Sequence, residues 1–357
     1  MIKRIFFVFL LIYTLVPGAQ SQVLPYRSDS VYFKRDTVRF GATLTIPGGK
    51  KTFPGVVLVS GSGKQDRNGT MAGHPMFKVL ADSLTRLGFA VLRVDDRGTG
   101  ETNGVYETAT TTDFADDALA ALGYLKQQKG VGKVGLIGHS EGGAAAIIAA
   151  AKSKDVAFVV TLAGLATNGL EALMLQNIGQ IKAADIPDYD KARHIAINTR
   201  MFDTAYHYAA SPEMEARLNA TYNEWKRADD SAYAKDKPGE HDHMRFPVYS
   251  YVRTAVGPWY RYHLQYDPVP FLQKIRVPFL ALNGDKDVMV PAKENLGNIE
   301  RTLLQSGNKN VTVKTIPGLN HLFLHCITCT NQENYTLKEE FAPEAWSEMK
   351  NWLKKLL

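Results

Sequence analysis

The fold is decided by one stretch, residues 133–151, which reads KVGLIGHSEGGAAAIIAAA. It begins with a short apolar run typical of a buried strand and ends with an Ala/Ile-rich run typical of a buried helix. Between them lies a G-x-S-x-G motif from Gly138 to Gly142, with Ser140 at its centre. This strand–turn–helix context is typical of a sharp turn that exposes a serine hydroxyl at the edge of a sheet. We therefore interpret Ser140 as a nucleophile, with a purely structural glycine turn as the alternative.

Outside this stretch, apolar runs bounded by turn residues alternate with helical patterns. Such alternation predicts parallel strands joined by crossover helices. The opening segments 31–40 and 42–46 are expected to form an antiparallel pair. Further strands are expected at residues 55–60, 89–94, 133–137, 156–162, 277–282 and 311–316. The sequence thus predicts an α/β fold with a mostly parallel central sheet flanked by helices.

This regularity stops between residues 166 and 270, where polar and aromatic-rich helical patterns replace the buried-strand runs. We expect residues 166–270 to be a helical cap inserted into a core made of residues 22–165 and 271–357. The cap should set specificity. Its aromatic residues favour mostly core positions, with a wall over Ser140 as the alternative; they are Tyr249, Tyr251, Trp259, Tyr260, Tyr262 and Tyr266.

Residues 1–21 have the layout of a secretory signal peptide. A basic start at Lys3 and Arg4 is followed by an apolar run from Ile5 to Val16 and a small-x-small cleavage signal at 19–21. The apolar run is too short to span a bilayer comfortably. We predict export to the periplasm or the medium, with no stable membrane insertion after cleavage. An uncleaved anchor is the alternative.

The charge balance and the cysteine count limit the partners of the chain. A net charge of +6 at pH 7 without a dense Lys/Arg block argues against nucleic acid, so we expect a small-molecule partner. The two cysteines, Cys326 and Cys329, have C-x-x-C spacing, which predicts a short disulfide in an exported protein. Free thiols, a redox motif and a zinc site shared with His321 and His325 are the alternatives. The oligomeric state is left open.

A serine hydroxyl is a poor nucleophile at neutral pH, so it needs a histidine as base and an acid that orients the histidine. After a nucleophile of this kind, the acid and then the histidine follow along the chain. The acid is Asp285 or Asp287, and the base is His321, in the loops after the last two expected strands. The main-chain N–H of Glu141, at the start of a helix, is placed to hold a developing oxyanion.

Three further motifs carry a resemblance to a known family. Residues 61–69, GSGKQDRNG, are similar to a G-S-G-x-x-D-R-D-G oxyanion loop; residues 95–100, DDRGTG, to a D-x-R-G-x-G turn; and residues 320–323, NHLF, to the surroundings of a catalytic histidine. The chain resembles the α/β-hydrolase superfamily, and within it exported bacterial esterases of the dienelactone-hydrolase-like group. The likeness extends over residues 31–357 apart from the cap.

The resemblance implies the α/β-hydrolase fold and a choice between the two aspartates. Residues 282–291, LNGDKDVMVP, resemble the family pattern L-x-G-x-x-D-x-x-V-P, which selects Asp287 as the acid. Asp285 would then be a loop-capping carboxylate. In the oxyanion loop, the resemblance implies the N–H of Ser62 as a second donor beside Glu141.

The resemblance also implies an activity, the hydrolysis of carboxylic esters without a cofactor or metal. Asp66 and Arg67 are expected to pair and hold the oxyanion loop, with a solvated pair as the alternative. Arg97 is expected to be structural, with a catalytic role as the alternative. Alternatives on the same three residues are a thioesterase, an acyltransferase or a small peptidase. A non-catalytic hydrolase-like binding protein is a further alternative.

Overall fold

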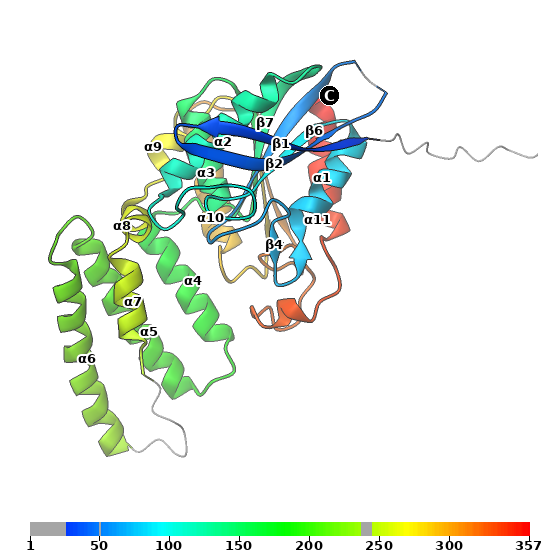
Figure 1. Cartoon of the computed structure of the whole chain (residues 1–357). Helices are drawn as coiled ribbons and strands as arrows, with labels where there is room; N and C mark the ends of the chain where they lie inside the picture. The colour runs from blue at the N-terminus through cyan, green and yellow to red at the C-terminus, as the bar shows by residue number, and fades with distance from the viewer. Residues whose placement is uncertain (1–25, 50, 237–244) are drawn as a thin grey trace, which may run out of the picture.

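The computed structural model describes residues 26–49, 51–236 and 245–357. The predicted signal peptide lies outside these residues. A sheet-centred core and a group of helices projecting from it make up the molecule (Figure 1).

The core is built on an eight-stranded sheet of order β1-β2-β6-β3-β7-β8-β9-β10. Its strands are β1 (Arg27–Arg35), β2 (Val38–Ile46), β3 (Phe53–Val59), β6 (Ala90–Val94), β7 (Val131–His139), β8 (Val156–Leu162), β9 (Phe279–Gly284) and β10 (Val311–Ile316). β2 pairs antiparallel with β1 and β6, and the other pairs are parallel. The predicted α/β-hydrolase fold with a mostly parallel sheet is confirmed.

The first strand pair differs from its predicted bounds. The turn falls at Asp36, which has φ 51°, so the expected first strand 31–40 is divided between β1 and β2. Aspartate is one of the few residues that tolerate a positive φ, and this one follows two charged residues on an exposed edge. The apolar pattern alone continues across the turn, which is why it predicted one strand.

Helices cover both faces of the sheet. On one face lie α2 (Thr111–Lys126), α3 (Glu141–Lys152) and α10 (Ala292–Gln305); on the other lie α1 (Met76–Leu87) and α11 (Pro343–Leu353). β3 shows the alternation that serves both faces, because Val57 packs in the first cluster and its neighbours Val56 and Leu58 in the second. A small hairpin, β4 (Thr70–Met71) with β5 (His74–Pro75), precedes α1.

The helical insertion lies between β8 and β9 along the chain. It contains α4 (Gly169–Ala183), α5 (Asp188–His207), α6 (Met214–Asp236), α7 (Val248–Ala255) and α8 (Pro258–Gln265), and the short α9 (Val269–Leu272) leads back to the core (Figure 1). The insertion has an apolar cluster of its own, with Met201 and Leu218 fully buried. Within the described residues, no helix is long and apolar enough to cross a membrane.

The two ends of the insertion lie next to each other. The main-chain N–H of Gly169 donates a hydrogen bond to the main-chain oxygen of Tyr266, at 2.9 Å. A Cβ at position 169 would lie 1.6 Å from the main-chain oxygen of His263, so glycine is required for α4 and α8 to approach this closely. The insertion therefore leaves the core and returns to it at nearly the same place.

Candidate active site

Ser140 lies on the turn between β7 and α3 with φ 55° and ψ −122°, a conformation that is strained for a residue with a side chain. Close packing fixes this turn. A Cβ on Gly138 would lie 2.1 Å from the main-chain oxygen of Gly142, and a Cβ on Gly142 would lie 2.1 Å from that of Val59. The glycines on both sides of the serine are thus required, and the serine side chain is left half-exposed at the end of the strand.

His321 and Asp287 are in direct contact. Nδ1 of His321 lies 2.8 Å from Oδ2 of Asp287, whose side chain is fully buried. The other carboxylate oxygen, Oδ1, accepts hydrogen bonds from the N–H groups of Met289 and Val290, each at 2.8 Å. The aspartate is therefore fixed by its own loop, and it holds the imidazole through one ring nitrogen while leaving the other free to act.

Asp285 occupies a different environment two residues earlier. It is exposed, and its Oδ1 accepts a hydrogen bond from the N–H of Gly318 at 2.6 Å. This bond holds the turn that precedes His321. Of the two candidate acids, the structure places only Asp287 on the imidazole.

Ser140 and His321 line the same cavity, which has a volume of about 200 Å³. Its other lining residues are Gly61, Ser62, Gln65, Met71, His139, Glu141, Leu165, Ala172, Leu173, Gln176, Trp259, His263, Met289 and Val290. Among the described residues, no hydrogen bond joins Ser140 to His321. Nucleophile and base commonly reach hydrogen-bond distance only when substrate binds.

His139 also contacts His321. Its Nε2 lies 2.9 Å from the main-chain oxygen of His321, and the two ring centroids are 4.7 Å apart. Burial lowers the pKa of His139 to about 3, so the ring is neutral and the nitrogen facing the carbonyl carries the proton. Residue 139 is a variable position of the G-x-S-x-G motif, so the sequence does not indicate a role for this histidine.

The loop after β3, which carries Ser62, is anchored by a half-buried carboxylate. Asp96 accepts a hydrogen bond from the Ser60 hydroxyl through Oδ1 and one from the N–H of Gln65 through Oδ2, the latter at 2.9 Å. Burial raises the pKa of Asp96 to about 7. The N–H of Gly63 donates to the hydroxyl of Tyr106 at 2.7 Å. The loop is thus held at three points along its length.

The expected pair of Asp66 with Arg67 is wrong. Nη2 of Arg67 lies 2.5 Å from carboxylate oxygens of both Asp95 and Glu101. Asp66 instead accepts hydrogen bonds within its own turn, including one from the N–H of Asn68 at 3.1 Å. Asp95 follows β6 and is almost fully buried. The long side chain of Arg67 therefore pairs with Asp95 more favourably than with Asp66, its neighbour in the chain.

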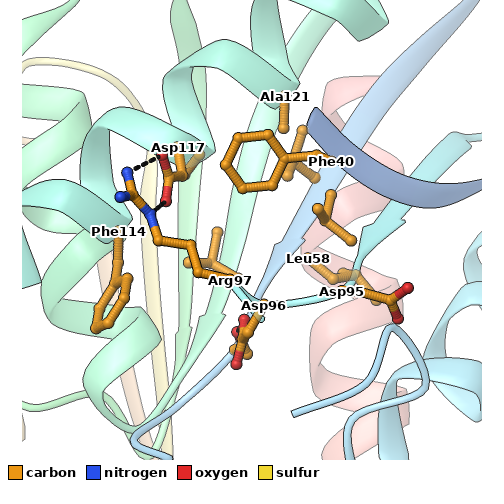
Figure 2. Close-up of a pocket in the computed structure, with 13 residues that line it drawn as sticks. Phe40, Leu58, Asp95, Asp96, Arg97, Phe114, Asp117 and Ala121 are labelled. Carbon is orange, nitrogen blue, oxygen red and sulfur yellow. Dashed lines mark hydrogen bonds and ion pairs between the residues drawn. The ribbon is translucent and has the colours of Figure 1, made fainter. Parts of the chain in front are cut away.

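Arg97 takes part in a neighbouring ion pair. Figure 2 shows its guanidinium turned toward Asp117 of α2, and two hydrogen bonds of 2.7 and 2.8 Å join them. The same view shows Asp95 and Asp96 side by side after β6, at a second pocket that Phe40 and Phe114 also line. Arg97 therefore ties the turn after β6 to α2.

Glu141 follows Ser140, and its side chain has partners that the sequence did not reveal. The carboxylate is buried and accepts hydrogen bonds from Ser62, Thr111 and Trp259. Of the six cap aromatics singled out in the sequence, Trp259 is the one that lines the cavity with Ser140 in the part of the chain described here. Tyr249 is exposed instead.

The residues of the alternative zinc site have other partners. Cys326 and Cys329 form a disulfide with each other, as the C-x-x-C spacing predicts. His321 contacts Asp287, and Nδ1 of His325 lies 3.0 Å from a carboxylate oxygen of Glu339. In the described ranges, no group of three or more histidine, cysteine, aspartate or glutamate side chains is arranged to hold a metal ion.

The amino-acid sequence is similar to those of known proteins. The sequence profile of the alpha/beta hydrolase fold matches residues 56–325. Esterase EstD of Thermotoga maritima is 24% identical over 312 residues, which cover 87% of this chain and 65% of the relative. The chain thus spans slightly less than two thirds of that protein.

Solved structures share the fold at low identity. The α/β hydrolase GrgF from Penicillium superimposes with a TM-score of 0.54 at 18% identity, covering 93% of this chain and 99% of the other. An esterase of Pyrococcus furiosus, Pf2001, gives a TM-score of 0.51 at 18% identity, covering 93% and 91%.

Proposed function

This chain belongs to the alpha/beta hydrolase fold family, and we propose that it is a serine-dependent hydrolase of carboxylic esters. One observation carries the proposal. A serine on a strained turn shares a cavity with a histidine whose far ring nitrogen is held by a buried aspartate, 2.8 Å away. The esterase names of two distant relatives support the same class of reaction.

The proposed reaction is a two-step acyl transfer. Ser140 Oγ attacks the ester carbonyl while Nε2 of His321 takes the hydroxyl proton, and Asp287 stabilises the imidazolium. The main-chain N–H groups of Ser62 and Glu141 bind the oxyanion of the tetrahedral intermediate. The C–O bond to the alcohol then breaks, and the histidine returns its proton to the leaving oxygen. A water activated by His321 hydrolyses the acyl-enzyme. The sequence of steps uses no cofactor.

The cavity supports a small-molecule ester as substrate. Apolar side chains of Leu165, Leu173 and Val290 contribute to its wall, and Trp259 and His263 of the insertion add an aromatic surface. Such a wall favours an apolar or aromatic group near the scissile bond. The residues of the insertion would therefore set the preferred substrate.

Sequence motifs support a narrower placement. The oxyanion-loop motif at 61–69 favours the dienelactone-hydrolase-like esterases, and the signal-peptide pattern at 1–21 favours export to the periplasm or medium. Fractionation of cells that express the full chain tests the second point, since an exported enzyme leaves the cytoplasmic fraction and loses its leader. Retention of a full-length chain in the cytoplasm would contradict export.

Hydrolysis of aryl esters of graded acyl length, with Ser140→Ala as the matched control, tests the activity. We expect burst release of the aryl alcohol and covalent labelling of Ser140 by a fluorophosphonate, both lost in Ser140→Ala. Thioesters, amides and acyl acceptors in the same assay separate an esterase from a thioesterase, peptidase or acyltransferase. A folded protein that is neither labelled nor active would indicate a non-catalytic binding protein.

A further inference from the structure

The side chain of Glu141 lies inside the protein, 2% exposed, at the first position of α3. Three donors from three separate segments surround it. Oε2 accepts from Oγ of Ser62 at 2.7 Å, and Oε1 accepts from Oγ1 of Thr111 at 2.6 Å and from Nε1 of Trp259 at 2.7 Å. The carboxylate thus joins the oxyanion loop, the start of α2 and helix α8 of the insertion.

Burial makes these bonds strongly dependent on one another. A buried carboxylate that loses a hydrogen-bond donor pays a large desolvation cost, so all three donors stabilise one position of the side chain. The N-terminal end of a helix also favours a negative charge. Glu141 therefore has a well-defined position, set from the core by Thr111 and from the insertion by Trp259.

Ser62 links the position of the Glu141 side chain to the proposed oxyanion hole. Its N–H is the proposed second oxyanion donor, and its hydroxyl is bound to Glu141. The other anchors of its loop described above end on Asp96 and Tyr106, which belong to the core. Among the hydrogen bonds of the described residues, the bond from Ser62 to Glu141 is the one that links this loop, through Trp259, to the insertion.

Trp259 links the insertion to Glu141, and it also lines the cavity in which a substrate would bind. Its ring lines the cavity and stacks on His263 of the same helix, with centroids 4.9 Å apart and ring planes 19° apart. A ligand in the cavity therefore contacts an indole whose N–H is bound to the carboxylate. A shift of α8 changes this bond directly.

We propose that Glu141 is a positioning residue that couples helix α8 of the insertion to the oxyanion loop. With the Trp259 N–H in place, the carboxylate holds Ser62 so that its N–H faces the developing oxyanion. The inference rests on the proposed ester hydrolysis and adds to it a path by which the insertion controls the rate of the chemical step as well as the choice of substrate.

Two variants that remove one donor each test the coupling. Trp259→Phe deletes the N–H and keeps an aromatic wall, and Ser62→Ala deletes the hydroxyl and keeps the main-chain N–H. Loss of an oxyanion-hole donor lowers kcat by about 10²–10³, so a misplaced donor should lower it by roughly tenfold. Because the defect concerns the transition state, KM should change by less than about threefold.

The double variant separates coupling from two unrelated defects. If both residues act through Glu141, Trp259→Phe combined with Ser62→Ala should be no slower than the worse single variant. Tyr262→Phe is the matched control, because it removes another hydrogen bond between α8 and α2, of 2.6 Å to Thr112, that does not involve Glu141. We expect this control to retain the kcat of the natural chain.

Substitutions of Glu141 itself provide a rescue test. Glu141→Gln keeps an oxygen for Trp259 and an amide that can donate to Ser62, so it should retain several-fold more kcat than Glu141→Ala. Losses of kcat that multiply in the double variant, or an equal loss of kcat in Tyr262→Phe, would overturn the coupling.

Labelling by a fluorophosphonate distinguishes the two proposals. If the natural chain is not labelled, ester hydrolysis at Ser140 is contradicted. If the natural chain is labelled and Trp259→Phe has the same kcat as the natural chain, only the coupling is contradicted.

Discussion

The imidazole of His139 donates a hydrogen bond to the main-chain oxygen of His321, 2.9 Å away, across 182 positions of sequence. The residue before the proposed nucleophile thus fixes the backbone of the proposed base, while Asp287 fixes its ring. Both contacts are needed to define where the imidazole lies, because one constrains the main chain and the other the side-chain rotation.

Replacing His139 with phenylalanine should impair catalysis more than binding. The ring would be retained, but the carbonyl of His321 would lose its donor, at a cost of about 1–3 kcal/mol in the free energy of unfolding. We expect kcat to fall by roughly 10- to 100-fold with little change in KM, measured by steady-state hydrolysis. His325→Phe, an exposed histidine in the same segment, is the control. Equal losses in both variants would show that His139 has no special role.

The two aspartates of the β9 loop should differ sharply in their effect on rate. Asp287→Asn keeps the size of the side chain but favours the wrong imidazole tautomer, and should lower kcat by about 10⁴. Asp285→Asn removes only the charge on an exposed group that binds Gly318, so kcat should stay within about tenfold. A larger loss in Asp285→Asn than in Asp287→Asn would reassign the acid.

Ser140 and His321 should behave as one unit. Each single alanine variant should lower kcat by on the order of 10⁴–10⁶, and the double variant should be little worse, because either change removes the same proton transfer. Pre-steady-state and steady-state hydrolysis by the three proteins provide the comparison. Losses that multiply would mean that the two side chains act in separate steps or sites.

The half-buried carboxyl of Asp96 should make the free energy of unfolding depend on pH. Burial raises its pKa from the ordinary 3.8 to about 7. The folded protein therefore binds a proton here that the unfolded chain has released, and this group lowers the free energy of unfolding as the pH rises from about 4 to 7.

Asp96→Asn should remove that dependence. Its amide oxygen can still accept from the N–H of Gln65, and its NH₂ group can donate to the Ser60 hydroxyl, which becomes the acceptor of that bond. The natural chain should lose on the order of 2–4 kcal/mol in the free energy of unfolding from pH 4 to pH 8 because of this group, and the variant should not. The difference in the free energy of unfolding between variant and natural chain should therefore grow by that amount over this range. Urea unfolding curves across this range measure the difference. Parallel pH profiles for the two proteins would contradict a raised pKa for Asp96.

The sequence predicted features that depend on neighbouring residues. The strand–turn–helix around Ser140 requires its glycines locally, and the loops with Asp287 and His321 follow recognisable strands, so their meeting at one sheet edge follows from parallel topology. The contact between Asp287 and His321 was expected for the same reason.

Features that depend on distant packing were missed or wrong. The donors to Glu141 come from three segments far apart in sequence, and nothing near residue 141 indicates them. The sequence pairs Arg67 with its neighbour Asp66 because it shows proximity only along the chain, whereas the partner Asp95 directly follows β6, the strand next to β3 in the sheet. A long side chain selects its partner by burial and geometry, which sequence spacing does not encode.

The hydrogen bond between Gly169 and Tyr266 joins the two ends of the helical insertion where it meets the core. Because the insertion begins and ends at nearly the same place, we expect that a segment of different length or shape can be exchanged there as a unit. Exchange of the whole insertion would then change the cavity wall without changing the strands and loops that carry Ser140, Asp287 and His321. In this chain, a replacement would also have to supply a donor where the indole now stands.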